Sequence, residues 1–310
     1  MTASPFPVLR LKPKANARAI RHGAPWVYDN ELVLDRRSKS LVPGTIAVLE
    51  DAERRPMGLV ASNPLSRITA RMIERDVSVA IDQAWFERKI TRALELRTRL
   101  FDKPNYRLIH AEADGLPGLV VDRFGDALVV QPNAAWLELL LEPLSAALQQ
   151  VTGVSTILKN AAGRTRSLEG LDDENTVLLG DAPDAPIMVS MNGASYAADL
   201  TGGQKTGLFY DQRPNHAFAA RLSEGADVLD VFSHVGGFGL AALAGGATSA
   251  LCVDGSAPAL ALAEQGAAEA GFSDRFATRK GDAFDVLEAL GQEGAQFDVV
   301  ICDPPAFAPG

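Results

Sequence analysis

The sequence predicts an α/β protein with a small β-rich barrel at the N-terminus, a central α/β domain and a C-terminal domain built on a parallel sheet. Three observations lead to this fold class. Short strand-like runs between Pro and Gly turns fill the first 75 residues, strands and helices mix in the middle, and strands alternate with helices beyond about residue 190. The expected domain boundaries are 1–76, 77–190 and 191–310.

The composition is that of a globular protein, with 47% hydrophobic and 22% charged residues among 310. No apolar run reaches the roughly 18–20 residues that a membrane span needs, and the N-terminus lacks the apolar stretch of a signal peptide. Two cysteines are too few for a disulfide framework or a zinc cluster, and the four histidines are scattered, so no metal site is expected. We therefore expect a soluble, cytoplasmic protein.

The net charge of −9 is unevenly distributed along the chain. Residues 1–75 carry 13 Lys and Arg against 7 Asp and Glu, whereas residues 191–310 carry 6 against 15. An acidic total argues against a nucleic-acid partner, because proteins that bind phosphates usually carry a basic surface. The basic N-terminal third makes such a partner possible again.

The first 75 residues contain strand-like segments at 8–12, 45–50, 57–62 and 68–73, a spacing that suits a small barrel. Between the first two, aromatic residues alternate with charges, and Trp26 has two interpretations, as a core residue of the barrel or as a nucleic-acid contact. The candidate nucleic-acid contacts of this module are Lys12, Lys14, Arg18, Arg21 and Trp26.

The middle of the chain reads as a second α/β module. Apolar residues at spacings of three and four predict a long amphipathic helix over 80–101, and turn signals predict hairpin-like strands over 106–133. A helix over 136–151, a strand over 155–160 and a polar loop over 163–175 follow.

The C-terminal part has the pattern of a parallel, doubly wound sheet. Strands are expected at 226–232, 249–254, 276–282 and 295–303, in the spatial order third, second, first, fourth, with helices at 240–247, 257–271 and 283–294 between them. Ligands bind at the carboxyl ends of such strands.

Four carboxylates, Asp230, Asp254, Asp282 and Asp303, fall at or near these carboxyl ends. The Gly-rich turn at 233–239 lets the backbone approach a ligand closely. Asp254, at the end of the second strand, is placed to accept hydrogen bonds from ribose hydroxyls. The sequence therefore predicts a nucleoside pocket.

The Gly turn matches the G-x-G-x-x-A dinucleotide fingerprint at Gly237, Gly239 and Ala242, which is a weak signal alone. Asp230 beside this turn repels a pyrophosphate and attracts a ligand that carries ammonium and sulfonium groups. S-adenosylmethionine has both groups and is favoured over NAD.

The segment directly after the fourth strand is Asp303-Pro304-Pro305-Ala306-Phe307. Two prolines impose a stiff extended turn that would aim the Asp303 carboxylate and the Phe307 ring over the reactive end of the cofactor. These groups suit a planar base, because one binds its edge and the other stacks on its face. Asp303, Pro304 and Phe307 are the catalytic candidates; a strand-terminating turn with Phe307 in the core is the alternative.

Five ordered motifs across the chain resemble the bacterial ribosomal RNA large-subunit methyltransferase I family: GAPWVYDNEL (23–32), EADGLPGLVVDRFGD (112–126), GGQKTGLFYDQRPN (202–215), VLDVFSHVGGFG (228–239) and DPPAF (303–307). The resemblance implies an N-terminal PUA-like domain that binds RNA, a central α/β domain and a C-terminal Rossmann-like methyltransferase domain. It also implies methylation of carbon 5 of a cytosine in 23S ribosomal RNA, with S-adenosylmethionine as methyl donor.

The resemblance further implies which residues hold the cofactor. A segment before the first strand of the parallel sheet closes over it, and residues at the strand ends line its site, with Asp282 near the adenine. Together with the neighbours of these strand ends, the candidate cofactor residues are Lys205, Thr206, Phe209, Asp211, Gln212, Arg213, Asp230, Ser233, Gly236, Gly237, Asp254, Gly255, Ser256, Asp282 and Ala283.

Four strands are fewer than the seven of a methyltransferase sheet, so we expect a chain truncated after its fourth strand. The family uses a cysteine located after the DPP motif to form a covalent adduct with the base. Cys252 and Cys302 are expected in the core, because free cysteine is often buried. Methylation of a guanine nitrogen and a catalytically inert RNA-binding protein are the alternatives, and a homodimer is left open.

Overall fold

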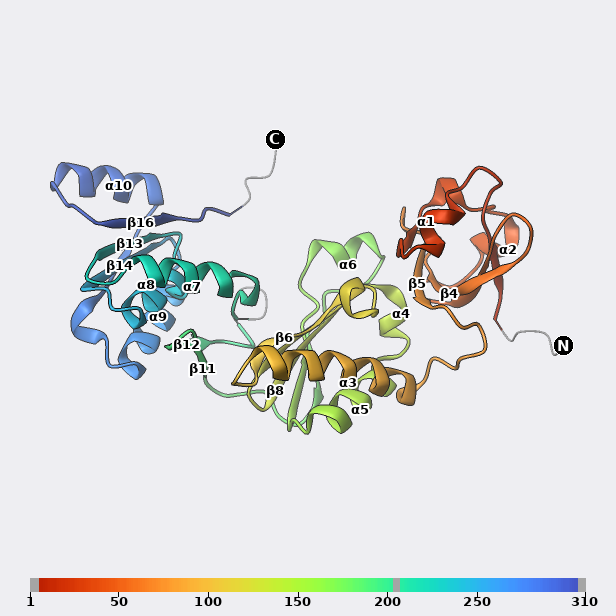
Figure 1. Ribbon diagram of the computed structural model, residues 1–310, viewed down its shortest axis with the longest axis horizontal. Coiled ribbons are helices and arrows are strands. Elements are labelled where there is room, and N and C mark those ends of the chain that lie inside the picture. Colours follow the sequence, from red (N-terminus) through yellow and green to blue (C-terminus); the bar gives the residue numbers. More distant parts are fainter. Residues whose placement is uncertain (1–5, 203–206, 306–310) are drawn as a thin grey trace. The chain divides into compact units, whose positions relative to one another are not determined.

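The computed structural model describes residues 6–202 and 207–305, and the chain divides into two compact units, Met1–Asp181 and Ala182–Gly310 (Figure 1). Within the described residues, no helix combines the length and the apolar character that a membrane span requires.

A β-barrel forms the N-terminal part of the first unit. Among the described residues its sheet has the order β1–β3–β4–β5–β2, and its elements are β1 (Val8–Arg10), α1 (Ala17–Arg21), β2 (Trp26–Val27), η1 (Asp29–Glu31), α2 (Arg36–Lys39), β3 (Ile46–Glu50), β4 (Pro56–Ser62) and β5 (Ala70–Glu74). A bridge between Leu11 and Leu32 joins the segments that follow β1 and β2, and this closes the barrel. The sequence pattern indicated β1, β3, β4 and β5 but missed β2.

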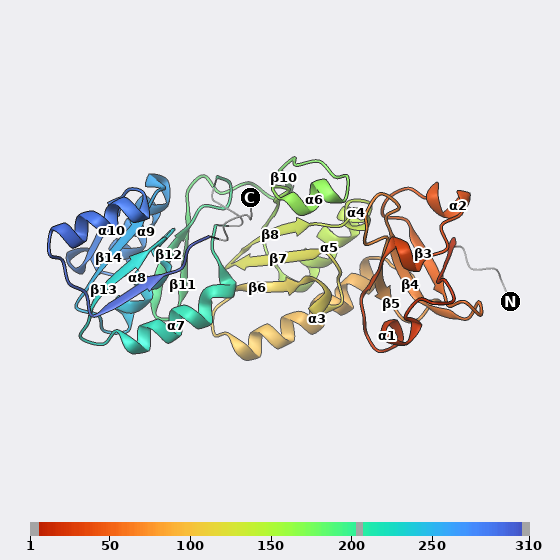
Figure 2. The same cartoon turned by 90° about the horizontal axis from the view of Figure 1, so that it is seen from above.

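A second sheet continues the first unit, with the order β10–β9–β8–β7–β6 among the described residues. Its elements are α3 (Gln83–Leu100), β6 (Asn105–His110), η2 (Ala111–Asp114), β7 (Leu119–Phe124), β8 (Ala127–Pro132), α4 (Ala135–Glu138), α5 (Leu141–Thr152), β9 (Thr156–Lys159), α6 (Arg164–Leu168) and β10 (Thr176–Leu179). The long helix α3 lies beside β6 and packs against α5 (Figure 2). Trp85, Phe86 and Trp136 form the centre of a core that also includes Val48 and Leu59 of the barrel.

Two predictions for this part were wrong in detail. The helix expected at 136–151 is interrupted after Glu138 and continues as α5. The loop expected at 163–175 contains the helix α6, because Arg166 is drawn into the interior, where its side chain is 1% exposed.

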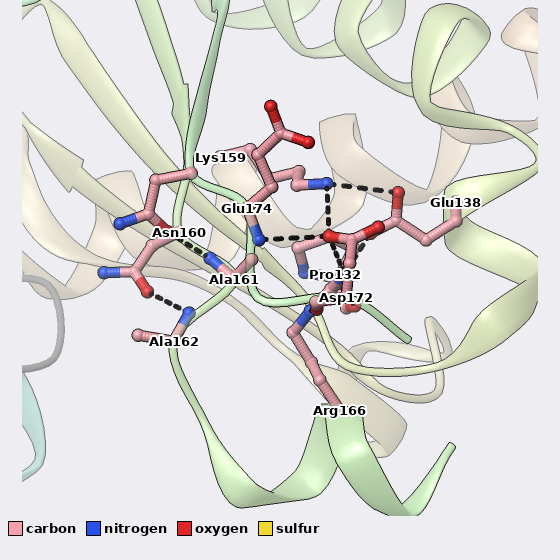
Figure 3. A network of polar contacts seen from close by, with 10 residues as sticks. Pro132, Glu138, Lys159, Asn160, Ala161, Ala162, Arg166, Asp172 and Glu174 are labelled. Atoms are coloured by element: carbon pink, nitrogen blue, oxygen red, sulfur yellow. Dashed lines mark hydrogen bonds and ion pairs between the residues drawn. The ribbon is translucent and has the colours of Figure 1, made fainter. Parts of the chain in front are cut away.

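Arg166 is held by a network of polar contacts (Figure 3). Its Nη1 donates to the carbonyl of Pro132 at 2.6 Å and to Oε1 of Glu138 at 2.5 Å, and its Nε donates to the carbonyl of Asp172 at 2.8 Å. The ammonium of Lys159 lies 3.4 Å from Oε2 of Glu138. The network ties α6 to the second sheet.

The residue after α6, Glu169, binds the barrel. Its Oε1 accepts from Nη2 of Arg71 at 2.8 Å, and its Oε2 accepts from Nδ2 of Asn63 at 2.9 Å. All three residues are buried. The barrel and the second sheet are therefore joined by buried ionic contacts as well as by a shared apolar core.

The second unit contains a parallel sheet whose order, β15–β14–β13–β16 in the described residues, confirms the predicted order. The elements of the unit are β11 (Ile187–Met191), β12 (Ala194–Ala198), η3 (Tyr210–Gln212), α7 (Arg213–Leu222), β13 (Asp227–Val231), α8 (Gly237–Ala244), β14 (Ser249–Asp254), α9 (Ala257–Glu269), η4 (Ser273–Arg275), β15 (Phe276–Lys280), α10 (Ala283–Gln292) and β16 (Val299–Cys302).

Strands β11 and β12 form a hairpin that the sequence interpretation missed. Its turn is Asn192-Gly193, with φ of 54° and 77°. An Asn-Gly pair favours such turns because both residues tolerate positive φ. Strand β12 packs against α8 and α9, which brings the hairpin beside the Gly-rich turn.

Candidate functional site

The carboxylates predicted to converge lie along one edge of the parallel sheet. Asp254 is the last residue of β14, and Asp303 directly follows β16. Asp282 follows β15 by two residues, and Asp230 is the penultimate residue of β13. Because the four strands are parallel, these positions lie at the same edge.

Asp230 lies beneath the turn and has no exposed surface. Its Oδ2 accepts from the backbone N–H of Gly239 at 2.9 Å and lies 3.8 Å from Sγ of Cys252. Its Oδ1 has no hydrogen-bond partner among the described residues. Burial raises the pKa of Asp230 to about 7, so this carboxyl is partly protonated at neutral pH.

The glycines of the turn are required by its geometry. Gly236, with φ of 75°, is the N-cap of α8. A Cβ on Gly239 would lie 2.5 Å from Sγ of Cys252, a separation that no side chain tolerates. Phe232 and His234 also have positive φ, 65° and 51°. Such backbone strain in residues other than glycine concentrates at functional sites.

Asp254 organises the next loop. Its Oδ2 accepts from the backbone N–H of His234 at 2.8 Å, and its Oδ1 accepts from that of Ser256 at 2.8 Å. Ser256 in turn caps α9. A Cβ on Gly255 would have no atom nearer than the carbonyl of Gly281 at 3.9 Å, so the surface here is open beside the carboxylate.

Asp282 is the N-cap of α10. Its Oδ1 accepts from the backbone N–H groups of Phe284 at 2.9 Å and Asp285 at 3.4 Å. Ala283 is 7% exposed, whereas the Phe284 ring is 69% exposed. An exposed ring beside a strand end is a feature that the sequence interpretation did not single out.

The segment expected to close over the cofactor contacts two loops of this edge. The Phe209 ring meets the His234 ring edge-on with centroids 5.1 Å apart. Nε2 of Gln212 donates to Oδ2 of Asp303 at 2.9 Å. Asp211 is exposed, and Arg213 begins α7. The candidates Lys205, Thr206 and Phe307 lie outside the described residues; Pro304 is exposed beside Asp303.

Sequence reasoning missed two residues, Tyr196 and His216, that lie against Gly237 of the Gly-rich turn. The hydroxyl of Tyr196, in β12, donates to the carbonyl of Gly237 at 3.2 Å. Nε2 of His216 lies 2.7 Å from where a Cβ of Gly237 would stand. Burial lowers the pKa of His216 to about 4 and raises that of Tyr196, so both are neutral at pH 7. If Asn192-Gly193 had been recognised as a hairpin turn, Tyr196 would have been assigned to the strand that follows it.

The two cysteines differ. Cys252 is buried, as predicted, and burial together with the Asp230 carboxylate raises the pKa of its thiol. The prediction of a core position for Cys302 was wrong, because Cys302 is exposed. Side chains of β16 alternate between half-buried and exposed, and Cys302 lies on the exposed face with Val300.

The basic candidates of the barrel, Lys12, Lys14, Arg18 and Arg21, are all exposed. Lys12 donates to the carbonyl of Asn30 at 2.9 Å, and Arg21 pairs with Asp51.

Trp26 is 39% exposed, so the interpretation of this residue as barrel core was wrong. Val27 is buried, and the alternation of a strand therefore leaves Trp26 and Tyr28 on the outer face. With Arg67 they line a hollow of about 540 Å³ beside α1.

No group of three or more His, Cys, Asp or Glu residues with metal-binding geometry occurs in residues 6–202 or 207–305.

Two known protein families match separate parts of the chain. The family of PUA-like domains matches residues 9–75, and the family described as conserved hypothetical protein 95 matches residues 215–308. The chain is 37% identical to the ribosomal RNA large subunit methyltransferase I of Shewanella denitrificans, over 97% of this chain and 76% of that protein. It is 36% identical to a ribosomal RNA large subunit methyltransferase of Deinococcus radiodurans, over 99% and 77%.

Solved structures share the fold. SMU.776, a methyltransferase crystallised with SAH, superposes with a TM-score of 0.82 at 20% identity, over 98% of this chain and 77% of that one. A structure described as a SAM-dependent methyltransferase of Streptococcus mutans has a TM-score of 0.80 at 20% identity, over 97% and 77%.

Proposed function

The chain belongs to the ribosomal RNA large subunit methyltransferase I family, and from this premise we propose that it transfers a methyl group from S-adenosylmethionine to 23S ribosomal RNA, with carbon 5 of a cytosine as acceptor. The observation that carries the proposal is the row of carboxylates along the Gly-rich edge of the parallel sheet, Asp230, Asp254, Asp282 and Asp303. The chain would act in the cytoplasm, where ribosomal RNA is found.

The residues at this edge fit the proposed cofactor. Oδ1 of Asp230 and Oγ of Ser233 are buried and lack hydrogen-bond partners among the described residues, and unpartnered buried oxygens are costly unless a ligand satisfies them. Asp254 would hold the ribose hydroxyls beside the open surface at Gly255 and Ser256. Asp282 and Ala283 would lie at the adenine, and the segment that contains Phe209, Asp211 and Arg213 would close over the site.

When bound, the cofactor supplies a methyl group on a positively charged sulfur: the carbon–sulfur bond breaks as a bond to the base forms, the acceptor loses a proton, and S-adenosylhomocysteine remains. The acidic edge favours a cationic donor. The described residues would hold the acceptor in line, because positioning of two reactants removes much of the barrier. Carbon 5 of a cytosine also needs a thiolate that adds at carbon 6 before the transfer and leaves when the carbon 5 proton is lost, the role of the cysteine that the family uses after its DPP motif.

Asp303 and Pro304 would receive the target base. The Asp303 carboxylate is exposed at the end of β16, where it can bind the edge of a base that has been flipped out of its stack. Phe307 follows on the same segment and would stack on the base face.

The barrel would hold the RNA. Lys12, Lys14, Arg18 and Arg21 supply exposed positive charge for phosphates. Trp26 supplies an exposed aromatic surface on which an unpaired base can stack. We thus propose residues 1–76 as the RNA-binding domain, 77–181 as the central domain and 182–310 as the transfer domain. The boundary expected at 190 moves to 181, because β11 pairs with β12 in the second unit.

Incubation of the protein with tritiated S-adenosylmethionine and large ribosomal subunits or their RNA tests this function. Nuclease digestion then identifies the labelled nucleoside. We expect 5-methylcytidine. A labelled methylguanosine would show that the acceptor is a guanine nitrogen and not carbon 5 of a cytosine. RNA binding without any S-adenosylmethionine binding would leave an RNA-binding protein and refute the proposed enzyme.

A further inference from the structure

Gln212 links the Asp303 carboxylate to the start of α7. The two residues are 91 positions apart in sequence, yet Nε2 of Gln212 donates to Oδ2 of Asp303 at 2.9 Å. Oε1 of Gln212 accepts from Nδ2 of Asn215 at 2.7 Å. Asn215 lies in the first turn of α7. A row of side-chain hydrogen bonds therefore runs from α7 through Asn215 and Gln212 to Asp303.

The direction of these bonds fixes what Asp303 can offer a base. An amide NH2 group only donates, and an ionised carboxylate only accepts. Asn215 occupies the oxygen of Gln212, so the NH2 group is the part that faces Asp303. Within residues 207–305, no side chain donates to Oδ1 of Asp303, which remains an acceptor for a group from outside.

We propose that Gln212 is a positioning residue that holds the Asp303 carboxylate in place, so that its Oδ1 can accept a hydrogen bond from the edge of the acceptor base. This inference rests on the proposed function, because it assigns Asp303 to the acceptor base.

The resemblance to the family placed Gln212 among residues that close over the cofactor. The structure provides a different task for it, since an N–H of its amide group donates to Asp303 and its oxygen accepts from Asn215. The two roles predict different losses. A cofactor contact would weaken cofactor binding, whereas a positioning residue would slow transfer at unchanged cofactor affinity.

The test uses the protein with Gln212→Ala, Gln212→Glu, Asp303→Asn and the double variant Gln212→Ala/Asp303→Asn. Methyl transfer to ribosomal RNA gives kcat and KM, and calorimetry gives the Kd of S-adenosylhomocysteine. Because Gln212→Ala removes a hydrogen bond to a charged group, we expect it to lower kcat/KM by about 10-fold or more. The Kd should change by less than about twofold.

Two readouts separate positioning from packing. The double variant should be no slower than Asp303→Asn, because the effect of Gln212 passes through Asp303. Gln212→Glu keeps the size of the side chain but places a carboxylate against Asp303, and it should be at least as slow as Gln212→Ala at pH 8. Gln292→Ala is the matched control, since Gln292 donates to Glu288 at 3.1 Å on the surface of α10; it should leave transfer unchanged.

Several outcomes overturn the proposal. A weaker Kd with unchanged kcat would make Gln212 a cofactor contact, and additive losses in the double variant would show that it does not act through Asp303. If the wild type binds RNA and transfers no methyl group, the proposed function fails and this inference falls with it.

Discussion

Asp230→Asn should make the second unit more stable at neutral and alkaline pH while weakening the cofactor site. Burial raises the pKa of Asp230 from 3.8 to about 7, so between these values the folded chain binds its proton more tightly than the unfolded chain does. Stability therefore falls as pH rises through this window and is constant above it. At about 1.4 kcal/mol per pKa unit, ionisation of the buried Asp230 lowers the free energy of unfolding by about 4 kcal/mol at pH 8.

Asparagine is neutral throughout this range and keeps an oxygen that can accept from Gly239. The difference in unfolding free energy between Asp230→Asn and the wild type should thus be small at pH 4 and grow to about 4 kcal/mol, in favour of the variant, by pH 8. Urea unfolding with hydrogen exchange of peptides from β13 and β14 measures this difference. Asp285→Asn removes an exposed carboxylate of the same unit and serves as control.

A difference that stays constant from pH 4 to pH 8 would refute the raised pKa of Asp230. The variant should also bind S-adenosylmethionine more weakly than the wild type, because the buried carboxylate is no longer available to a cationic ligand. Stability gained at the expense of binding is the expected signature of a functional group held in an unfavourable environment.

Three further substitutions test other parts of the chain. Arg166→Met should destabilise the first unit by about 3–5 kcal/mol, because it breaks a buried ion pair. Arg10→Met, at the more exposed Arg10–Glu50 pair, should cost at most about 1 kcal/mol. Urea unfolding followed by tryptophan fluorescence reports on this unit, since all three tryptophans lie in it, and equal losses for the two variants would contradict the network of Figure 3. Asp254→Ala should raise the Kd of S-adenosylhomocysteine by about 10-fold or more through lost ribose contacts, and an unchanged Kd in calorimetry would exclude that role. Trp26→Ala should weaken binding of ribosomal RNA fragments by about 5- to 100-fold if a base stacks there; equal affinity in a filter-binding assay would place the RNA elsewhere.

The sequence predicted the parallel sheet well because each of its strands is a short apolar run bounded by turn residues, a signal that lies within a few neighbouring positions. It predicted Tyr196 and His216 poorly, since their importance comes from Gly237, which stands 41 and 21 positions away. Contacts over such distances leave no local pattern. Arg166 was placed in a polar loop for the same reason, because its partners Pro132 and Glu138 lie in other elements.

The charge of the cofactor edge also differs from what a count of carboxylates implies. The sequence interpretation gave Asp230 the deciding role as a free negative charge, but this carboxyl is buried and partly protonated at pH 7. Oxygens of Asp254 and Asp282 accept hydrogen bonds from backbone N–H groups of their own loops. One oxygen of Asp303 accepts from Gln212. Asp230 adds to the attraction for a cation only when it loses its proton as the ligand arrives, so binding of a cationic cofactor should release a proton and strengthen as pH rises through about 7. Binding of a ligand with an uncharged thioether sulfur should follow pH less steeply.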